Sequence, residues 1–310
     1  MSDVRTVPVP DGLAGERVDV GIARLFGLSR TRAADLVTAG AVDIDGQAPA
    51  RSTRLEPGMM LTVEIPTERP AVEVRPMIAP GMTLVHEDED IVVVDKPVGV
   101  AAHPSAGWDG PTVLGHLAAA GVRITAGGPP ERRGIVSRLD VGTSGLMVVA
   151  KSERAYPVLK EAFSSRRVDK IYHALAQGHL DPRAGTIDAA IGRSPHHDYK
   201  YAVMSTGKHA ITHYEVIEEL PGADLLRIKL ETGRTHQIRV HMSAMRHPLV
   251  GDPLYGADPT LAERTGLVRQ WLHAMELAFE HPTRGERVSF SSQHPADLAH
   301  ALDVLREGAA

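Results

Sequence analysis

Hydrophobic positions near the start of the chain recur at helical spacing and then give way to short runs. Four apolar side chains followed by a glycine predict a first helix: Val18, Ile22, Leu25, Phe26 and Gly27. Ser29 stands at the N-cap position of a second helix, which Gly40 ends. Short strands follow at residues 42–44 and 60–65, and the first leads into an Asp-Gly turn. Residues 16–65 are therefore expected to form two short helices and a small antiparallel sheet.

The rest of the chain mixes strand patterns with helical ones. Apolar runs predict strands at residues 91–94, 146–149, 171–175 and 225–230, and a helical pattern covers residues 112–120. Because strands and helices do not alternate with a regular βαβ period, we expect an α+β fold rather than a doubly wound parallel sheet.

Polar and turn-forming residues suggest where the domains begin and end. We expect a flexible N-terminal lead at residues 1–15 and a small domain at 16–65. A semi-rigid linker with four prolines follows at 66–80, then a larger domain at 81–300 and a fraying C-terminal tail at 301–310.

The composition removes several classes of protein. There are no cysteines, which excludes disulfides, Cys-ligated metal sites and a thiol nucleophile. Asp3, Arg5 and Asp11 precede any apolar run, so the N-terminus does not resemble a secretory signal. The apolar runs are also far short of the roughly 20 residues that a membrane span needs. We therefore expect a cytoplasmic protein with no membrane partner.

The net charge of −5 by itself argues against a nucleic-acid partner, but the charge is unevenly distributed. Residues 131–246 contain 18 Lys and Arg against 13 Asp and Glu, while the remainder is acidic. A basic segment of this kind can form a patch that attracts phosphate groups.

Residues 134–146 form the densest cluster of small and polar residues in the chain. Asp140 follows a short apolar run and precedes a turn rich in Gly and Ser, beyond which a strand begins. Such a turn can hold a carboxylate at the mouth of a sheet as a nucleophile or base. The alternative is that Asp140 caps a turn or pairs with an arginine.

A second cluster spans residues 233–242. Thr235 is expected to cap a helix there, with Arg234 just outside it at the end of a strand. The alternative is a solvated helix face. His236 and His241 are five residues apart, rather than the four that place two ligands on one helix face, so no metal site is expected.

Residues 168–175 are predicted to form a strand with Lys170 and Tyr172 on one face. Tyr172 there either packs in the core or stacks on a base. A loop at residues 95–99 is expected to lie near a ligand, and residues 252–256 form a turn whose expected role is structural. No glycine motif for nucleotide phosphates occurs.

Together these clusters resemble the RluA/RluD family of pseudouridine synthases, mostly enzymes of large-subunit ribosomal RNA. Five ordered motifs carry the resemblance: K-P-x-G at 96–99, H-P at 103–104, R-L-D-x-x-T-S-G-L at 138–146, K-x-Y at 170–172 and G-R-T-H-Q-I-R-V-H-M at 233–242. Residues 16–65 resemble an S4 RNA-binding domain. One departure is Ser137, where the family usually has histidine.

The resemblance implies a catalytic domain with a mixed, mainly antiparallel sheet flanked by helices. It implies isomerisation of uridine to pseudouridine within RNA, with large-subunit rRNA as the expected substrate. In this reaction the N-glycosidic bond breaks, the uracil rotates, and a bond forms between the sugar and C5 of the base. Neither a cofactor nor a metal is needed, and we expect a monomer.

The resemblance also assigns roles to individual residues. Asp140 is expected to be the essential carboxylate, and Arg234 to pair with it and hold it ionised. Tyr172 is expected to stack on the target base and Leu230 to pack on its other face, while Arg138 enters the RNA stack as the uridine flips out. Phosphate and shape contacts are expected from four arginines of the small domain: Arg30, Arg32, Arg51 and Arg54. Attack at the sugar, attack at the base and elimination to a glycal all remain open.

The alternative function is a non-catalytic S4-type RNA-binding or ribosome-assembly factor. Asp140, Tyr172 and Arg234 argue against it, because binding alone does not require that carboxylate. A glycoside hydrolase needs two acidic groups at one bond, and the motifs offer only one.

Overall fold

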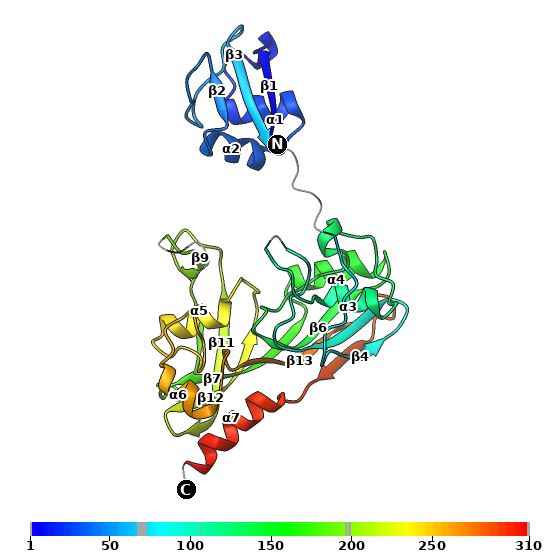
Figure 1. Ribbon diagram of the computed structural model, residues 1–310, viewed down its shortest axis with the longest axis vertical. Coiled ribbons are helices and arrows are strands. Elements are labelled where there is room, and N and C mark those ends of the chain that lie inside the picture. Colours follow the sequence, from blue (N-terminus) through cyan, green and yellow to red (C-terminus); the bar gives the residue numbers. More distant parts are fainter. Residues whose placement is uncertain (1, 67–72, 106, 196, 198–199, 309–310) are drawn as a thin grey trace. The chain divides into compact units, whose positions relative to one another are not determined.

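Two units make up the computed structural model, Met1–Ala71 and Val72–Ala310 (Figure 1). The structure describes residues 2–66, 73–105, 107–195, 197 and 200–308. Each unit has its own hydrophobic core, so each is described by itself.

The N-terminal unit combines two helices with a three-stranded antiparallel sheet of order β1-β3-β2. Its elements are β1 (Ser2–Pro8), a 3₁₀ turn (Asp11–Leu13), α1 (Val18–Phe26), α2 (Arg30–Thr38), β2 (Val42–Ile44) and β3 (Met60–Pro66). Gly27 ends α1 in the left-handed conformation, and the Ser29 hydroxyl accepts a hydrogen bond from the Arg32 N–H at 3.2 Å. Both helices and both predicted strands are confirmed.

The expectation of a flexible lead at residues 1–15 is wrong. Strand β1 pairs with β3 along its whole length, from Ser2 opposite Pro66 to Pro8 opposite Met60. Val9 and Leu13 are buried in the core of the unit. The alternating pattern of β1 is weak because Val4 points into solvent, so backbone hydrogen bonds to β3 rather than side-chain burial hold the strand.

The larger unit is built on one mixed sheet of order β4-β5-β6-β13-β7-β12-β11-β8, with β14 paired to β13. Its strands are β4 (Thr83–Glu87), β5 (Ile91–Lys96), β6 (Ser144–Ala150), β7 (Asp169–Gln177), β8 (Ala184–Asp188), β11 (Ile211–Leu220), β12 (Ala223–Leu230), β13 (Leu272–Glu280) and β14 (Arg287–Ser291). A separate ribbon pairs β9 (Ile191–Arg193) with β10 (Tyr201–Val203). The pair β6–β13 is parallel and the other described pairs are antiparallel, so the predicted α+β class is confirmed.

Helices cover the sheet and complete its cores (Figure 1). They are α3 (Val113–Ala119), α4 (Ala155–Ser164), α5 (Gln237–Ala244), α6 (Pro259–Thr265) and α7 (Ala296–Glu307), with a 3₁₀ turn at Pro130–Arg132. Val92 and Val149 pack in the same cluster as α3, whereas Val93 and Val148 pack in the cluster of α4. Burial on both faces explains why β5 and β6 are continuous apolar runs.

Two further domain boundaries differ from expectation. The tail predicted at residues 301–310 is wrong, because Leu302 and Leu305 of α7 are buried against the sheet. Part of the predicted linker, at residues 66–80, belongs to the larger unit: Ala79 is buried and the Met77 N–H donates to the Gly115 carbonyl at 3.0 Å. Residues 67–72 of that linker lie outside the described residues.

No helix in the described part of the chain is both long enough and apolar enough to cross a membrane.

Candidate active site

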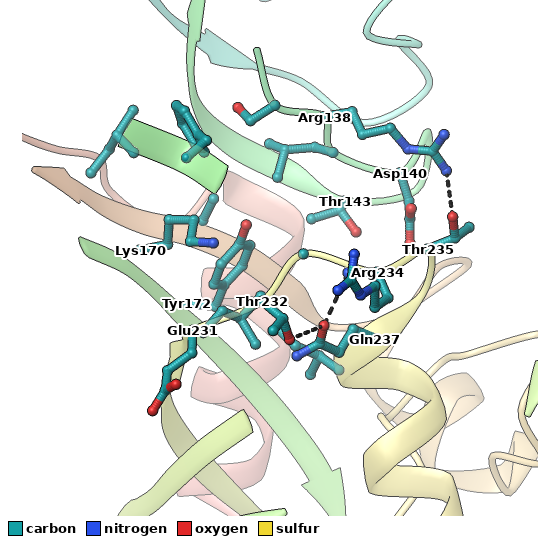
Figure 2. Close-up of a pocket in the computed structure, with 18 of the residues that line it drawn as sticks. Arg138, Asp140, Thr143, Lys170, Tyr172, Glu231, Thr232, Arg234, Thr235 and Gln237 are labelled. Carbon is teal, nitrogen blue, oxygen red and sulfur yellow. Dashed lines mark hydrogen bonds between the residues drawn. The ribbon is translucent and has the colours of Figure 1, made fainter. Parts of the chain in front are cut away.

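A pocket in the larger unit brings together the site residues predicted in this part of the chain: Arg138, Asp140, Tyr172, Leu230 and Arg234. Figure 2 labels four of them, Arg138, Asp140, Tyr172 and Arg234. They come from the loop before β6, from β7, from the end of β12 and from the loop before α5. Because β7 pairs with both β12 and β13, the centre of the sheet forms the floor of this pocket.

The loop that carries Asp140 is fixed by backbone hydrogen bonds. The Thr143 N–H donates to the Asp140 carbonyl at 3.0 Å, which closes a turn. The Val141 carbonyl accepts from the Gly99 N–H at 2.9 Å, so the K-P-x-G loop supports the turn from the side. Of the loop predicted at residues 95–99, Asp95 and Lys96 belong to β5. Val98 and Gly99 line a second hollow that Asp140 also borders.

Gly145 allows the strand after this loop to approach β13. Its φ is +116°, and a Cβ there would lie 2.4 Å from the Ala274 carbonyl oxygen. The two residues face each other in the parallel β6–β13 register. Only glycine permits this close backbone approach, which fixes the start of β6 directly after the loop that carries Asp140.

Two nitrogen groups converge on one oxygen of Asp140. Arg239 Nη1 lies 3.5 Å from Asp140 Oδ2, and His236 Nε2 lies 3.8 Å from the same atom. Arg239 and Asp140 are both largely buried, so their attraction is only weakly screened by water. The carboxylate is thus oriented from the α5 side of the pocket.

Arg239 is itself anchored by Asp252. Its Nε and Nη2 donate to the two oxygens of Asp252 at 2.7 and 2.9 Å, and its guanidinium lies 4.9 Å from the centre of the Tyr255 ring. Burial lowers the pKa of Arg239, but the hydrogen bonds and charge of Asp252, and then the charge of Asp140, outweigh burial and raise it. The guanidinium therefore stays charged where it meets Asp140.

The expected pairing of Arg234 with Asp140 is wrong. Arg234 Nε donates instead to the His209 carbonyl at 2.9 Å, and its backbone N–H donates to Gln237 Oε1 at 2.9 Å. Helix α5 starts later than predicted, after His236 in a left-handed conformation with φ 56°. This start leaves Arg234 in the preceding loop and places Arg239 on the buried side of the helix.

Thr235 does not cap the helix as expected. Its hydroxyl accepts a hydrogen bond from Arg138 Nη2 at 2.9 Å, which holds the exposed Arg138 across the pocket mouth (Figure 2). The predicted RNA-stacking residue is therefore restrained before any substrate enters.

His236 faces Asp140 through one ring nitrogen and Tyr255 through the other. The Tyr255 hydroxyl accepts from the Tyr201 N–H at 3.1 Å and lies 2.7 Å from His236 Nδ1. The hydroxyl proton is thus free to be donated to Nδ1, which leaves the ring proton on Nε2, toward Asp140. Burial lowers the pKa of His236, which favours this neutral form.

Tyr172 and Leu230 form the apolar part of the pocket. Tyr172 packs against two core clusters, and Leu230 is buried at the end of β12. Burial, followed by the charge of Asp140, raises the pKa of Tyr172 far above its ordinary value, so its phenol stays protonated. The strand faces predicted for residues 168–175 place Lys170 and Tyr172 on the pocket side, as expected.

Three charged residues near Asp140 had no expected role in the site from the sequence: Lys96, Arg239 and Asp252. Lys96 Nζ donates to the carbonyls of Pro97 and Val100 at 3.0 and 2.9 Å. Burial lowers its pKa to about 7, and the charge of Asp140 opposes that shift. A usable signal for Arg239 was its position three residues before Met242, on the apolar face of the helix. Asp252 was expected only as part of a structural turn at residues 252–256.

The four arginines predicted to touch RNA in the N-terminal unit are all exposed: Arg30, Arg32, Arg51 and Arg54. Arg51 Nε donates to Thr38 Oγ1 at 2.6 Å, and Arg54 Nη1 donates to the Gly15 carbonyl at 2.7 Å. Arg30 and Arg32 lie in the first turn of α2.

Within the described residues, one group of side chains has the spacing of a metal site: His179, Glu219 and Asp224. It lies outside the pocket, and protein donors already occupy it. Asp224 accepts from the Leu180 N–H at 2.7 Å and contacts His179 Nδ1 at 2.8 Å, while Glu219 pairs with Arg183. These hydrogen bonds and ion pairs explain why the three side chains lie together without a metal ion.

The mixed sheet carries a pocket in which Asp140 is oriented beside Tyr172 and several cationic side chains. This arrangement fits an enzyme that acts on an anionic substrate, and comparisons with known proteins identify its class. Residues 90–244 match the family described as RNA pseudouridylate synthase. An "Uncharacterized RNA pseudouridine synthase" of Mycobacterium bovis is 60% identical over 97% of this chain and 98% of its own length. "Ribosomal large subunit pseudouridine synthase D" of Pseudomonas aeruginosa is 40% identical over 99% of this chain and 98% of its own length.

Solved structures give the same result. "Human RNA Pseudouridylate Synthase Domain Containing 1" is 31% identical with a TM-score of 0.56, covering 70% of this chain and 87% of that one. "Human RNA Pseudouridylate Synthase Domain Containing 4" is 25% identical with a TM-score of 0.57, covering 72% and 92%. The chain belongs to the RNA pseudouridine synthases, which isomerise uridine to pseudouridine in RNA. This result favours the catalytic function over the binding-factor alternative.

Proposed function

We propose that this protein converts uridines of large-subunit ribosomal RNA to pseudouridine, with Asp140 as the essential carboxylate. The observation that carries the proposal is the position of Asp140, aimed by Arg239 and His236 into the pocket that Tyr172 lines. The relatives named as large-subunit enzymes support the choice of substrate.

In the proposed reaction Asp140 initiates cleavage of the bond between N1 of the uracil and C1′ of the ribose. The uracil rotates, C5 bonds to C1′, and C5 then loses its proton while N1 gains one, so that substrate and product are isomers. The roles of the flanking side chains follow from their places in the pocket. Tyr172 stacks on the uracil, and Leu230 packs on its other face.

Arg138 contributes at the pocket mouth. We infer that it leaves Thr235 and enters the RNA stack when the uridine flips out, which offsets part of the cost of unstacking. Arg234 contributes to RNA binding rather than to the orientation of Asp140.

The N-terminal unit is proposed to bind the same RNA, as an S4-type domain. Phosphate and shape contacts come from its exposed arginines: Arg30 and Arg32 at the start of α2, and Arg51 and Arg54 between β2 and β3. We further expect the enzyme to act as a monomer in the cytoplasm and without a cofactor.

The first test uses large-subunit rRNA transcribed with tritium at uridine C5. The wild type is expected to release tritium and Asp140→Asn to release none above background, with both proteins equally folded by circular dichroism. Wild-type activity on tRNA alone would contradict the proposed substrate. Silence of the wild type on rRNA, assembling subunits and tRNA would contradict the activity itself.

A further inference from the structure

One wall of the pocket carries positively charged side chains that take no part in the proposed isomerisation step. Arg166, Lys170 and Arg234 all line it, on the side formed by the end of α4, by β7 and by the loop after β12. Figure 2 shows Lys170 beside the Tyr172 ring, with its ammonium group turned toward the pocket.

The Lys170 side chain makes no hydrogen bond or ion pair with any described residue, although its backbone pairs with β13. Its contact is with the Phe163 ring, whose centre lies 5.9 Å from the ammonium nitrogen. Burial, followed by the charges of Arg166 and Arg234, lowers the pKa of Lys170 to about 8. A half-buried ammonium that faces two other cations is costly unless an anion joins them.

Arg166 is placed by an unusual backbone conformation. It follows α4 in the left-handed region with φ 61°, a position that glycine normally occupies at the end of a helix. Its Nη1 donates to Glu231 Oε2 at 3.1 Å, and its Nη2 lies 3.3 Å from His209 Nδ1. Backbone strain of this kind is found where a side chain must be aimed at a site.

Arg234 is held by a hydrogen bond to the backbone of His209, whose ring contacts Arg166. Its Nε is bound to the His209 carbonyl, but its terminal nitrogens have no partner among the described residues. Glu231 pairs with Arg166 and also contacts His213. The Lys170 ammonium and the terminal nitrogens of Arg234 therefore have no ion-pair partner among the described residues, and their positive charge is available to a group that enters the pocket.

We propose that Lys170, Arg166 and Arg234 form a subsite for a backbone phosphate of the RNA strand beside the flipped uridine. The inference rests on the proposed function. Lys170 and Tyr172 are two residues apart on one face of β7, a separation of about 7 Å. A base stacked on Tyr172 would thus place a phosphate of its own or the next nucleotide against Lys170. Forked arginine donors and a lysine ammonium are the groups that bind phosphate best.

The test uses a short RNA that the wild type modifies, prepared with one uncharged methylphosphonate linkage at each position flanking the target uridine. One such linkage is expected to raise the wild-type KM roughly tenfold to a hundredfold, the effect of losing a charge-assisted contact. Lys170→Gln should have a KM raised to the same degree and should not respond to that linkage. Its kcat should stay unchanged, which also shows that the variant folds.

Salt dependence gives a second readout. Removing one phosphate contact should reduce the slope of log KM against log salt by about 0.7 for a single strand. Lys170→Arg should restore the slope, and Arg166→Gln should reproduce the loss. The matched control is Arg264→Gln on α6, which removes one positive charge outside the pocket and should leave both readouts as in the wild type.

An active wild type whose Lys170→Gln variant keeps full sensitivity to every flanking linkage would overturn the phosphate subsite and leave the proposed function intact. A wild type that releases no tritium from any RNA would overturn the proposed function, and the subsite with it. The two failures are therefore distinguishable by the activity of the unmodified enzyme.

Discussion

At the scale of single residues, the arrangement around Asp140 depends on a chain of buried charges. Asp252 holds Arg239 by two hydrogen bonds, and Arg239 in turn contacts Asp140. Asp252 does not line the pocket, whereas Arg239 does. Asp252 therefore acts through Arg239 as a positioning residue. The sequence predicted only a structural role for the turn that contains Asp252. That prediction is incomplete, because Asp252 also holds the arginine that contacts Asp140.

Asp252→Asn should therefore damage turnover more than binding. The amide keeps the shape of the carboxylate but removes its charge, so Arg239 is less firmly oriented toward Asp140. We expect kcat to fall by about tenfold to a hundredfold, as for a lost positioning contact, while KM changes little. Tritium-release kinetics measure both constants. Arg239→Lys should show the same pattern, and wild-type kcat in Asp252→Asn would refute this role.

At the scale of elements, a histidine network joins β6, β7, β13 and the segment before α7. His173 Nδ1 lies 3.0 Å from His294 Nε2, and His273 bridges Ser144 and Ser292 at 2.8 and 3.0 Å. Burial comes first among the causes that lower the pKa of His273 to about 3 and that of His173 to about 4, followed by the neighbouring histidine. The network is thus neutral in the folded protein.

This network predicts loss of stability in mild acid. The unfolded chain binds protons at these histidines near pH 6.5, whereas the folded protein takes them up only near pH 3 to 4. The free energy of unfolding should therefore fall as pH drops from about 6.5 to about 4, by about 1.4 kcal/mol per pH unit for each excluded proton. Carboxylates with lowered pKa values, such as Asp90, contribute only at lower pH.

Urea unfolding at several pH values measures this slope. In His273→Gln the unfolding free energy should depend less steeply on pH, by the contribution of about one proton. His300→Gln, which changes an exposed position on α7, should have the same pH dependence as the wild type. An unchanged slope in His273→Gln would show that other groups set the acid sensitivity.

Also at this scale, most elements could be predicted and their exact ends could not. The apolar runs of β5, β6, β7 and β12 were visible because burial leaves a pattern in neighbouring residues. Strand β1 was missed because its partner, β3, lies more than fifty residues away in sequence and supplies backbone hydrogen bonds that leave no pattern. Helix α5 was placed too early because Thr235 has the properties of a cap but binds Arg138 instead.

At the scale of the whole molecule, the chain has two separately cored units. The core of the N-terminal unit contains residues from Val9 to Val63, and the clusters of the larger unit contain residues from Ala79 onward. Helix α7 is part of the larger unit, because Trp271 Nε1 donates to the Leu298 carbonyl and Arg269 pairs with Asp297. Each unit therefore has what it needs to fold by itself.

Deletion of residues 1–71 should thus leave the catalytic unit folded. Its thermal unfolding midpoint and its kcat on a short RNA should stay near the values of the full chain. KM for full-length rRNA should rise by about tenfold or more, because the phosphate contacts proposed for the N-terminal unit would be lost. The double variant Arg30→Gln/Arg32→Gln of the full chain should show part of that rise. An unfolded deletion protein would contradict the independence of the units.

By itself the sequence determined the local features: the end of α1 at Gly27, the cap of α2 at Ser29, the buried strands, and the motifs that identify Asp140 and Tyr172. These follow from neighbours along the chain, through backbone conformation and the alternation of apolar residues. Only the tertiary structure decided which arginine meets Asp140. That pairing depends on the turn at which α5 begins and on the buried Asp252, and contacts between distant segments set both.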